Sequence, residues 1–431
     1  MQVQEGQVIL VENERITELL PAEEAGKRNL TASGYEEIDL QGKYILPGLI
    51  NMHVHLAGNG KPQKKQRDNE ALVKKIMSNG LTKAIAYNMV CGFAKDELYS
   101  GVTTIRTVGG LGDFDTRLRD DIAAGKKPGP RILAANEGIS VPGGHMAGSV
   151  AIAADSVEEA LQHLETSKTQ KVDLVKLMIT GGVLDAKEKG VPGELKMAPE
   201  MVKAVCDKAH TMGYMVAAHV ESPEGVKAAL KNGVDSIEHG AKADEEMISL
   251  FKEHNAFLCT TLSPALPYAL FDRFITNASE VEQFNGNVVF EGIIDCAKAA
   301  IANDIPVVLG NDVDHPVRFL AGAVLFPQVC GSIQRFCTVY RNLPRRRDGG
   351  YRRYHRYTGI RQMRGYDRGG EESVRRSTGA SKCGYGHRTG KSDPCSQGEE
   401  KADRRDGAGQ ISELEWNGNV CFRRIELYSD A

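Results

Sequence analysis

The sequence predicts an α/β fold, a (β/α)8 barrel of the TIM type with a small β-sheet segment in front of it. Between Pro47 and Asp312, short apolar runs rich in β-branched residues alternate with segments of helical periodicity. Such alternation is typical of a parallel sheet. Counting the strand before His53, about eight strands follow one another over roughly 280 residues, which is close to the usual size of this barrel. A doubly wound open sheet is the alternative, but no Gly-rich phosphate loop follows an early strand.

The N-terminal segment, residues 1–46, contains three short strand-like runs at residues 7–12, 15–20 and 35–40. Polar turns separate them, as expected for strands of a small sheet. The runs are too short to form a core of their own. We therefore expect a small sheet that needs further strands from elsewhere in the chain.

The barrel segment covers residues 47–326, and its first strand begins slightly earlier, at Tyr44. Its strands are identified by β-branched and apolar runs, and its helices by apolar residues three or four positions apart. The expected strands cover residues 44–52, 101–108, 131–135, 172–179, 214–219, 236–239, 256–261 and 306–312. The expected helices cover residues 116–124, 156–167, 199–212, 223–232, 243–254 and 290–303. Residues 57–100 are an unusually long connection, which we interpret as a lid or a solvated insertion.

The motif His53-Val54-His55 closes the first barrel strand. Residues two apart on a strand point to the same face, so these two imidazoles can bind one cation. Zinc and its neighbours accept imidazole ligands. The motif alone is a weak signal, because two histidines this close also occur by chance.

Further polar residues recur at the ends of the predicted strands. His53 and His55, Lys176, His219, His239 and Asp312 all lie within or at the end of such a strand. In a barrel these ends meet on one face, where active sites lie. Each residue also has a structural interpretation: His239 as a core histidine, Asp312 as a helix cap and Lys176 as a surface lysine. Their common placement on five strands favours a shared site.

The motifs together resemble the amidohydrolase superfamily, in the branch with imidazolonepropionase-like and Xaa-Pro dipeptidase-like (prolidase-like) enzymes. The segments that carry the resemblance are Leu46-Pro-Gly-Leu-Ile-Asn-Met-His-Val-His, Gly101-Val-Thr-Thr-Ile-Arg, Leu118-Arg-Asp-Asp-Ile-Ala-Ala-Gly, Val175-Lys-Leu-Met-Ile-Thr-Gly-Gly-Val, Ala217-Ala-His, Gly233-Val-Asp-Ser-Ile-Glu-His-Gly and Leu309-Gly-Asn-Asp. They occur in the family's order and spacing over about residues 7–315.

The resemblance implies two divalent metal ions, with zinc as the leading candidate and manganese or cobalt as alternatives. His53, His55 and Asp312 would bind the first ion. His219 and His239 would bind the second, and a carbamate on Lys176 would bridge the two. It also implies a metal-activated hydroxide that attacks an amide carbonyl, with Asp312 as general base and then acid.

His145, in the motif Gly143-Gly144-His145, resembles a histidine that the family often has at this place. We assign it to substrate binding, with a turn histidine as the alternative. Two positions depart from the family pattern. Glu221 stands where relatives often carry a small residue or another histidine, and Asn311 replaces the commoner threonine before Asp312.

The last segment, residues 327–431, differs from the rest in composition. It holds 18 arginines and 3 lysines, against 9 arginines and 24 lysines before it. Valine, isoleucine and leucine together number 11 there, too few for a core. A family member should have a last barrel helix and the strands that complete the N-terminal sheet, and neither is recognisable.

We interpret this Arg/Gly-rich segment as the product of a reading-frame shift between about residues 313 and 350. Read one base later, residues 351–359 can encode an Ala- and Thr-rich helix, depending on the third bases. A basic disordered tail that binds nucleic acid, or a divergent domain, are the alternatives. A shifted frame would remove the closing helix and partner strands, and would impair the fold and the activity.

The leading functional prediction is a metal-dependent amidohydrolase that cleaves a dipeptide or an N-acyl amino acid. A cyclic-amide hydrolase of the imidazolonepropionase type is the alternative within enzymes, and a non-catalytic metal- or nucleic-acid-binding protein is the alternative outside them. The start of the chain lacks the features of a signal peptide, and nine cysteines without a C-x-x-C pair favour reduced thiols. We therefore expect a cytoplasmic protein with a small-molecule substrate, no membrane partner and a homo-oligomer as one possible state.

Overall fold

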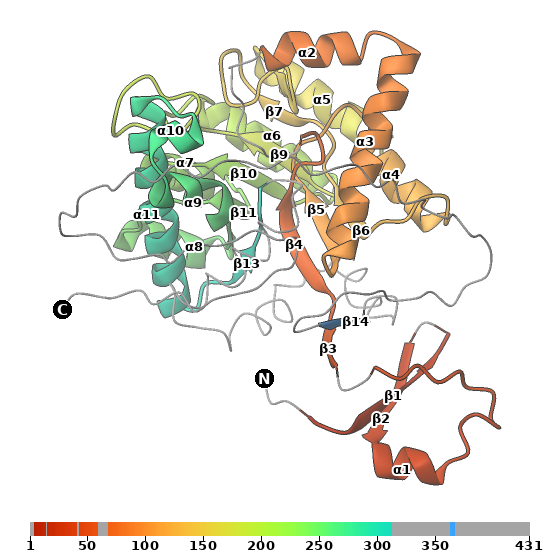
Figure 1. Ribbon diagram of the computed structural model, residues 1–431. Coiled ribbons are helices and arrows are strands. Elements are labelled where there is room, and N and C mark those ends of the chain that lie inside the picture. The colour runs from red at the N-terminus through yellow and green to blue at the C-terminus, as the bar shows by residue number, and fades with distance from the viewer. Residues whose placement is uncertain (1–3, 14, 41–42, 59–67, 313–362, 367–431) are drawn as a thin grey trace, which may run out of the picture. The chain divides into compact units, whose positions relative to one another are not determined.

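The computed structural model describes residues 4–13, 15–40, 43–58, 68–312 and 363–366. The chain divides into two compact units, residues 1–37 with 46–364 and residues 38–45 with 365–431. The predicted ligands, between His53 and Asp312, all fall within the residues of the first unit. Figure 1 labels the helices and strands of the chain. Within the described residues, no helix combines the length and the apolar composition that crossing a bilayer requires.

The N-terminal segment forms an antiparallel hairpin of β1 (Gln7–Glu12) and β2 (Arg15–Pro21), followed by α1 (Ala22–Lys27). Leu10, Leu20 and Ala25 form its small core. The expected strand at residues 35–40 is wrong, because no strand forms there. Its only large aliphatic side chain before Leu40, that of Ile38, is 69% exposed and so gains little from strand pairing.

The strand expected at residues 44–52 is two strands, β3 (Tyr44–Pro47) and β4 (Leu49–Val54). β3 pairs with β14 (Met363–Tyr366), while β4 pairs with a barrel strand. Gly48 lies between them. β14 is the one part of residues 327–431 that the structure describes, so the interpretation of that segment lies outside the described residues.

Ten strands make the two larger sheets, in which every assigned strand pair is parallel. One sheet has the order β4-β5-β6, and the other the order β13-β12-β11-β10-β9-β7-β8. After β4 the strands are β5 (Val102–Thr107), β6 (Arg131–Ala134), β7 (Gly138–Ser140), β8 (Ala151–Ala153), β9 (Val175–Met178), β10 (Val216–Val220), β11 (Ser236–His239), β12 (Phe257–Thr260) and β13 (Val307–Leu309). The seven barrel strands predicted after residue 100 are thus present.

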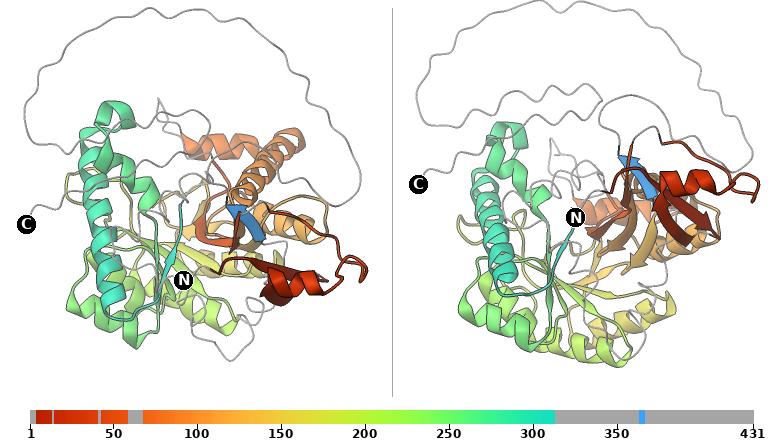
Figure 2. Two further views of the ribbon diagram at one scale, coloured as in Figure 1. Left: turned by 60° about the horizontal axis from the view of Figure 1, so that its bottom comes forward. Right: turned by 90° about the horizontal axis from the view of Figure 1, so that it is seen from below.

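The helices lie along the outside of these strands (Figure 2). They are α2 (Asn69–Ile76), α3 (Gly80–Tyr99), α4 (Phe114–Ala123), α5 (Val157–Thr169), α6 (Pro199–Thr211), α7 (Pro223–Lys231), α8 (Glu245–Glu253), α9 (Leu262–Leu270), α10 (Arg273–Thr276) and α11 (Glu280–Ala302). α11 begins ten residues before the predicted helix, at a capping box of Ser279 and Glu282. The long connection at residues 57–100 contains α2 and α3. α3 buries Val90 and Ala94 in the main core, so it is part of the fold and not a solvated insertion.

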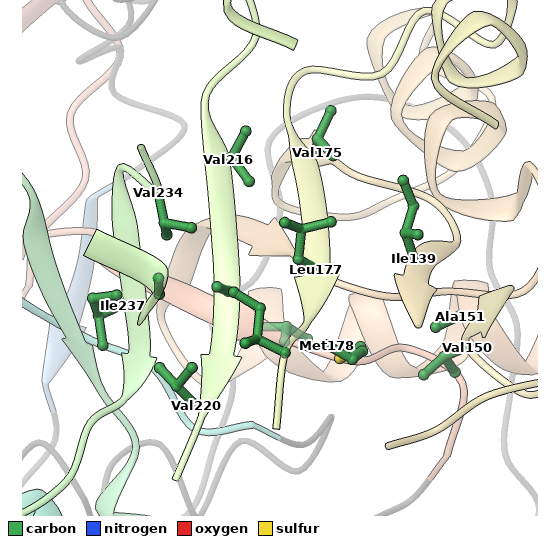
Figure 3. Close-up of a cluster of buried hydrophobic side chains, with 14 of the residues drawn as sticks. Ile139, Val150, Ala151, Val175, Leu177, Met178, Val216, Val220, Val234 and Ile237 are labelled. Carbon is green, nitrogen blue, oxygen red and sulfur yellow. The ribbon is translucent and has the colours of Figure 1, made fainter. Parts of the chain in front are cut away.

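Both faces of the parallel strands are buried, as expected for such sheets. On β10, Val216, Ala218 and Val220 join the large core cluster, while Ala217 joins a different one. Figure 3 shows part of the large cluster, with side chains from β7, β9, β10 and β11 packed together. Lys176 and His219 alternate with these apolar residues and so lie on the opposite face of their strands.

Backbone hydrogen bonds also link both edge strands of the smaller sheet, β4 and β6, to the larger sheet. Asp173 N, just before β9, donates to Ala134 O of β6 at 2.7 Å. Asn311 N and Asp312 N, just after β13, donate to His53 O of β4 at 3.2 and 2.9 Å. The first and last predicted ligands of the site are therefore joined through their backbones.

Candidate metal centre and active site

His53, His55 and Asp312 bring three ligand atoms together. Asp312 Oδ1 lies 2.9 Å from His53 Nε2 and 3.2 Å from His55 Nε2, and the two Nε2 atoms are 3.3 Å apart. His55 Nδ1 donates to Gly109 O at 2.9 Å, because a carbonyl can only accept. His55 Nε2 in a neutral ring is then a lone pair aimed at a carboxylate, an arrangement that a shared cation would stabilise.

His219 and His239 lie beside this group. The His239 ring is 4.9 Å from the His53 ring and 4.6 Å from the His219 ring, centroid to centroid. His219 Nε2 donates to Gly181 O at 3.2 Å, which leaves Nδ1 as the ligand atom of a neutral ring. Burial holds the pKa of both imidazoles well below the usual value, so both are neutral and able to bind a metal.

Lys176 supports the same interpretation from β9. Its side chain is among the largest fully buried ones in the structure, and its Nζ has no hydrogen-bond partner among the described residues. Burial lowers its pKa to about 8, against the opposing effect of Glu238 and Asp312. A buried amine that loses its proton this easily can react with carbon dioxide, and the resulting carbamate would offer two oxygen atoms to a metal.

The backbone is left-handed at two of these positions, with φ of 69° at His239 and 56° at Asp312. Non-glycine residues adopt this conformation at a cost, and it often marks functional sites. At His239 this conformation affects where the side chain points. Consecutive residues on a strand ordinarily point to opposite faces. Here Glu238 contacts His53, and His239 Nδ1 also lies on this side, 3.9 Å from Asp312 Oδ2.

Glu238 is a site residue that the sequence prediction missed. Its Oε2 lies 2.7 Å from His53 Nδ1, and its Oε1 accepts from Arg106 Nη2 at 2.6 Å. Burial opposes its ionisation, but Arg106 and then His53 outweigh burial and hold the pKa of Glu238 well below its usual range. The ionised Glu238 accepts a hydrogen bond from His53 Nδ1, so the lone pair of His53 lies on Nε2, which faces Asp312.

A second buried carboxylate, Glu97 of α3, was also missed. Asn311 Nδ2 donates to its Oε1 at 3.1 Å and Asn51 Nδ2 to its Oε2 at 3.4 Å. Asn51 Oδ1 in turn accepts from Asn311 N at 3.2 Å. This group fixes the residue before Asp312 and the strand of His53. These contacts also explain the asparagine at position 311, because its side-chain amide donates to Glu97 while its backbone N–H donates to Asn51.

His145 stacks on His219, with ring centroids 4.0 Å apart and planes 5° from parallel. Its Nδ1 lies 2.5 Å from Asp185 Oδ2, and Asp185 also accepts from Gly182 N. His145 thus lies at the edge of the histidine cluster, and no sequence motif indicated Asp185. Glu221 follows β10 in the same region and accepts from Val183 N at 3.0 Å.

The sequence model of the amidohydrolase family matches residues 44–335. The chain belongs to the amidohydrolase family. The matched range contains all six predicted ligands and His145.

Among solved structures, this amidohydrolase is similar to a Bifidobacterium longum protein assigned as a prolidase. The identity is 30% and the TM-score 0.60, over 76% of this chain and 74% of the other. It is also similar to a Xaa-Pro dipeptidase with methionine bound in its active site, at 25% identity and a TM-score of 0.60, over 74% and 78% of the two chains. These likenesses agree with a TIM barrel-type fold.

Curated relatives include the ochratoxinase of Aspergillus niger, 24% identical over 51% of this chain and 48% of its own length. The imidazolonepropionase of Mesorhizobium japonicum is 27% identical over 52% and 56%. The chain spans about half the length of the curated relatives it matches.

The residues present fit a divalent metal of the kind this family binds. The neutral imidazoles of His219 and His239, the ionised Asp312 and the buried Lys176 amine, which has no hydrogen-bond partner among the described residues, surround one small region. Three groups of described residues have ligand atoms within 4.8 Å of one another: His53 with His239 and Asp312, His219 with Glu221 and His239, and His53 with Glu238 and Cys259. Nitrogen and carboxylate donors of this type suit zinc, and also manganese or cobalt.

Proposed function

We propose that the protein is a metal-dependent amidohydrolase that cleaves the amide bond of a dipeptide or an N-acyl amino acid. The observation that carries the proposal is the approach of His53 Nε2, His55 Nε2 and Asp312 Oδ1 to within 3.3 Å. Membership of the amidohydrolase family and the likeness to a Xaa-Pro dipeptidase support the substrate class.

His53, His55 and Asp312 would hold one ion, and His219 and His239 a second, with a carbamate on Lys176 between them. Bound zinc would polarise the substrate carbonyl and lower the pKa of water. The carbamate would form by reaction of the neutral Lys176 amine with carbon dioxide, and the lowered pKa of Lys176 favours this reaction.

Asp312 would move the proton in this reaction. Burial opposes its ionisation, but His53 and His239 outweigh it and hold the pKa of Asp312 well below its usual range. An ionised carboxylate in this place can accept a proton from water and deliver it to the leaving amine. His145, oriented by Asp185 and stacked on His219, would contact the substrate.

We also infer that the two sheets close into one (β/α)8 barrel. The backbone bonds from Asp173 to Ala134 and from Asp312 to His53 support closure at both junctions. A barrel would explain why ligands from β4, β9, β10, β11 and the end of β13 lie together.

The test is turnover by the reconstituted full chain. The metal-free protein is loaded with zinc, manganese or cobalt and assayed for amino-acid release from panels of dipeptides and N-acyl amino acids. We expect activity with at least one metal, and a loss of about 10²- to 10⁴-fold in Asp312→Asn, the size of a general-base contribution. Glu224→Gln, an exposed carboxylate of α7, is the matched control.

No turnover by any loaded form would overturn the proposal and favour a non-catalytic metal-binding protein. Turnover of imidazolonepropionate alone would favour a cyclic-amide hydrolase, the alternative to which the imidazolonepropionase relative points. Salt-sensitive nucleic-acid binding in place of turnover would favour a basic binding segment.

A further inference from the structure

We propose that Glu221 is a ligand of the second metal ion, together with His219 and His239. The inference rests on the two-ion centre of the proposed function. It adds a carboxylate to that centre at a position where the family resemblance implies a small residue or a histidine.

The three side chains lie at the right separation to share an ion. One ligand atom each from His219, Glu221 and His239 lies within 4.8 Å of the others. Nitrogen and oxygen ligands sit about 2.0–2.2 Å from zinc, so opposite ligands of one ion are separated by roughly 4 Å. Small side-chain rotations are therefore enough to close the group around a cation.

The loops around Glu221 hold its carboxylate in this place. Glu221 N donates to Thr180 Oγ1 at 3.1 Å, and Glu221 Oε2 accepts from Val183 N at 3.0 Å. Gly193 packs so tightly on the Glu221 backbone that a Cβ there would lie 2.4 Å from its carbonyl carbon. Contacts from two loops thus hold Glu221 in this place.

Charge also favours a cation beside Glu221. Asp185, the nearby carboxylate, has His145 as its partner at 2.5 Å. Within the described part of the chain, Glu221 forms no ion pair with a basic side chain, and its carboxylate accepts one backbone bond, from Val183 N. That bond accounts for one oxygen. Burial, and then Asp312, raise the pKa of Glu221 to about 8 in the metal-free chain. A divalent ion between Glu221 and the neutral His219 and His239 would stabilise the ionised carboxylate.

A centre that includes Glu221 should differ in its metal affinity from a centre whose only anionic bridge is the carbamate on Lys176. With Glu221 as a ligand, the second position has a negative charge of its own. It should then retain part of its affinity when bicarbonate is removed and no carbamate can form on Lys176.

The test measures metal binding and not activity. The metal-free full chain is titrated with zinc by calorimetry, with cobalt by its visible absorption, and its bound metal is counted by elemental analysis. We expect two ions in the wild type. Glu221→Gln should keep the first ion and weaken the second by more than the roughly 10- to 100-fold that loss of an outer-shell partner costs. Glu224→Gln, which removes the same charge three residues away, should bind as the wild type does.

Two equal ions in both wild type and Glu221→Gln would overturn the inference while the proposed function stands. A single ion in the wild type would also overturn it, because the second position would then be no site. No ion in the wild type would overturn both proposals. If Glu221→Gln does not fold, as judged by circular dichroism, Glu221→Asp decides: a shortened carboxylate that binds the second ion with wild-type affinity contradicts the inference.

Discussion

Buried charge at single residues determines which ligand atoms the site can offer. Arg106 lies under the site and donates to Glu238 Oε1, Ser236 Oγ and Met52 O. Glu238 in turn holds His53. Arg106 is therefore a positioning residue, which acts on the proposed ligand His53 only through Glu238.

Replacing Arg106 with methionine should destabilise the protein by about 3–5 kcal/mol, because it leaves the Glu238 charge buried without its partner. Chemical denaturation of the metal-free chain would measure this. Lys203→Met is the control, since its pair with Asp207 is exposed and should cost about 0.5 kcal/mol or less. Equal losses in the two variants would contradict the role given to Arg106.

Lys176 should carry a carbamate when metal and bicarbonate are both present. The amine, whose pKa is lowered to about 8 by burial, is neutral in a useful fraction at pH 7 to 8 and can react with carbon dioxide. Nuclear magnetic resonance with ¹³C-bicarbonate should show a carbamate signal that is absent in Lys176→Ala. Lys196→Ala, a lysine paired with Glu194, is the control and should keep the signal. A signal that survives in Lys176→Ala would refute the assignment.

The sequence identified the residues proposed as ligands but not the partners that orient them. His53, His219 and Asp312 were recognisable because each ends a predicted strand. Glu238 and Glu97 were not recognisable, because a glutamate in a strand or helix is interpreted as solvent-exposed until its distant partner is known. His53 and Glu238 are 185 positions apart, and no local pattern encodes such a pairing.

Helices and strands were predictable where their apolar pattern is local. The β-branched runs predicted β5 and β9 because both faces of a parallel strand are buried. The run at residues 35–40 misled because Ile38 is exposed and no partner strand exists among the described residues. α3 was missed as part of the core because its apolar residues encircle the helix and show no single face.

Gly310 sets how closely the end of β13 can approach β4. A Cβ at this position would lie 2.2 Å from His53 Cβ and 3.0 Å from His53 N. Gly310→Ala should therefore destabilise the chain by about 1–3 kcal/mol, as overpacking does, and should weaken metal binding because it moves His53. Thermal melting and metal titration would measure both effects.

Gly92→Ala in α3 is the matched control. A Cβ there meets nothing within 4 Å, so the change should stabilise the helix by about 0.5–1 kcal/mol. If Gly310→Ala were as stable as the wild type, the close approach of the two strands would be disproved.

His163 of α5 should make stability depend on pH. Burial lowers its pKa below the usual 6.5, against a weaker opposing bond to Glu137 O. The folded protein favours the neutral form of His163. The contribution of this residue to the free energy of unfolding is therefore present above about pH 6.5 and is lost as the pH falls below that value. His163→Gln should lose less stability than the wild type between pH 7 and pH 5, as measured by denaturant titration. Parallel curves would contradict this expectation.

For the whole molecule, metal ions should act as part of the fold. The proposed ligands come from five separate strands or strand ends, so an ion that binds only the folded state would stabilise all of them together. At a free metal concentration a thousandfold above its dissociation constant, the gain is about 4 kcal/mol for one site. Chelation should lower the melting temperature, and zinc should restore it; in His53→Ala, chelation should change it much less.

The interpretation of residues 327–431 stays a prediction, since the structure describes only β14 within them. Composition alone supports it, with 18 arginines beside 3 lysines. Sequencing the gene across codons 310–350 would test it. A reading frame that gives no apolar helix or strand pattern one base later would reject the shift.

The backbone bonds from Asn311 and Asp312 to His53 have a consequence for folding order. They join positions more than 250 residues apart, so the centre cannot assemble until nearly all the barrel strands have left the ribosome and found their places. Contacts of such high sequence separation form slowly, after their loop-closure entropy has been overcome. Metal uptake during refolding should accordingly be a late event. Its rate would report the docking of the last strand on the first, and not the formation of the helices.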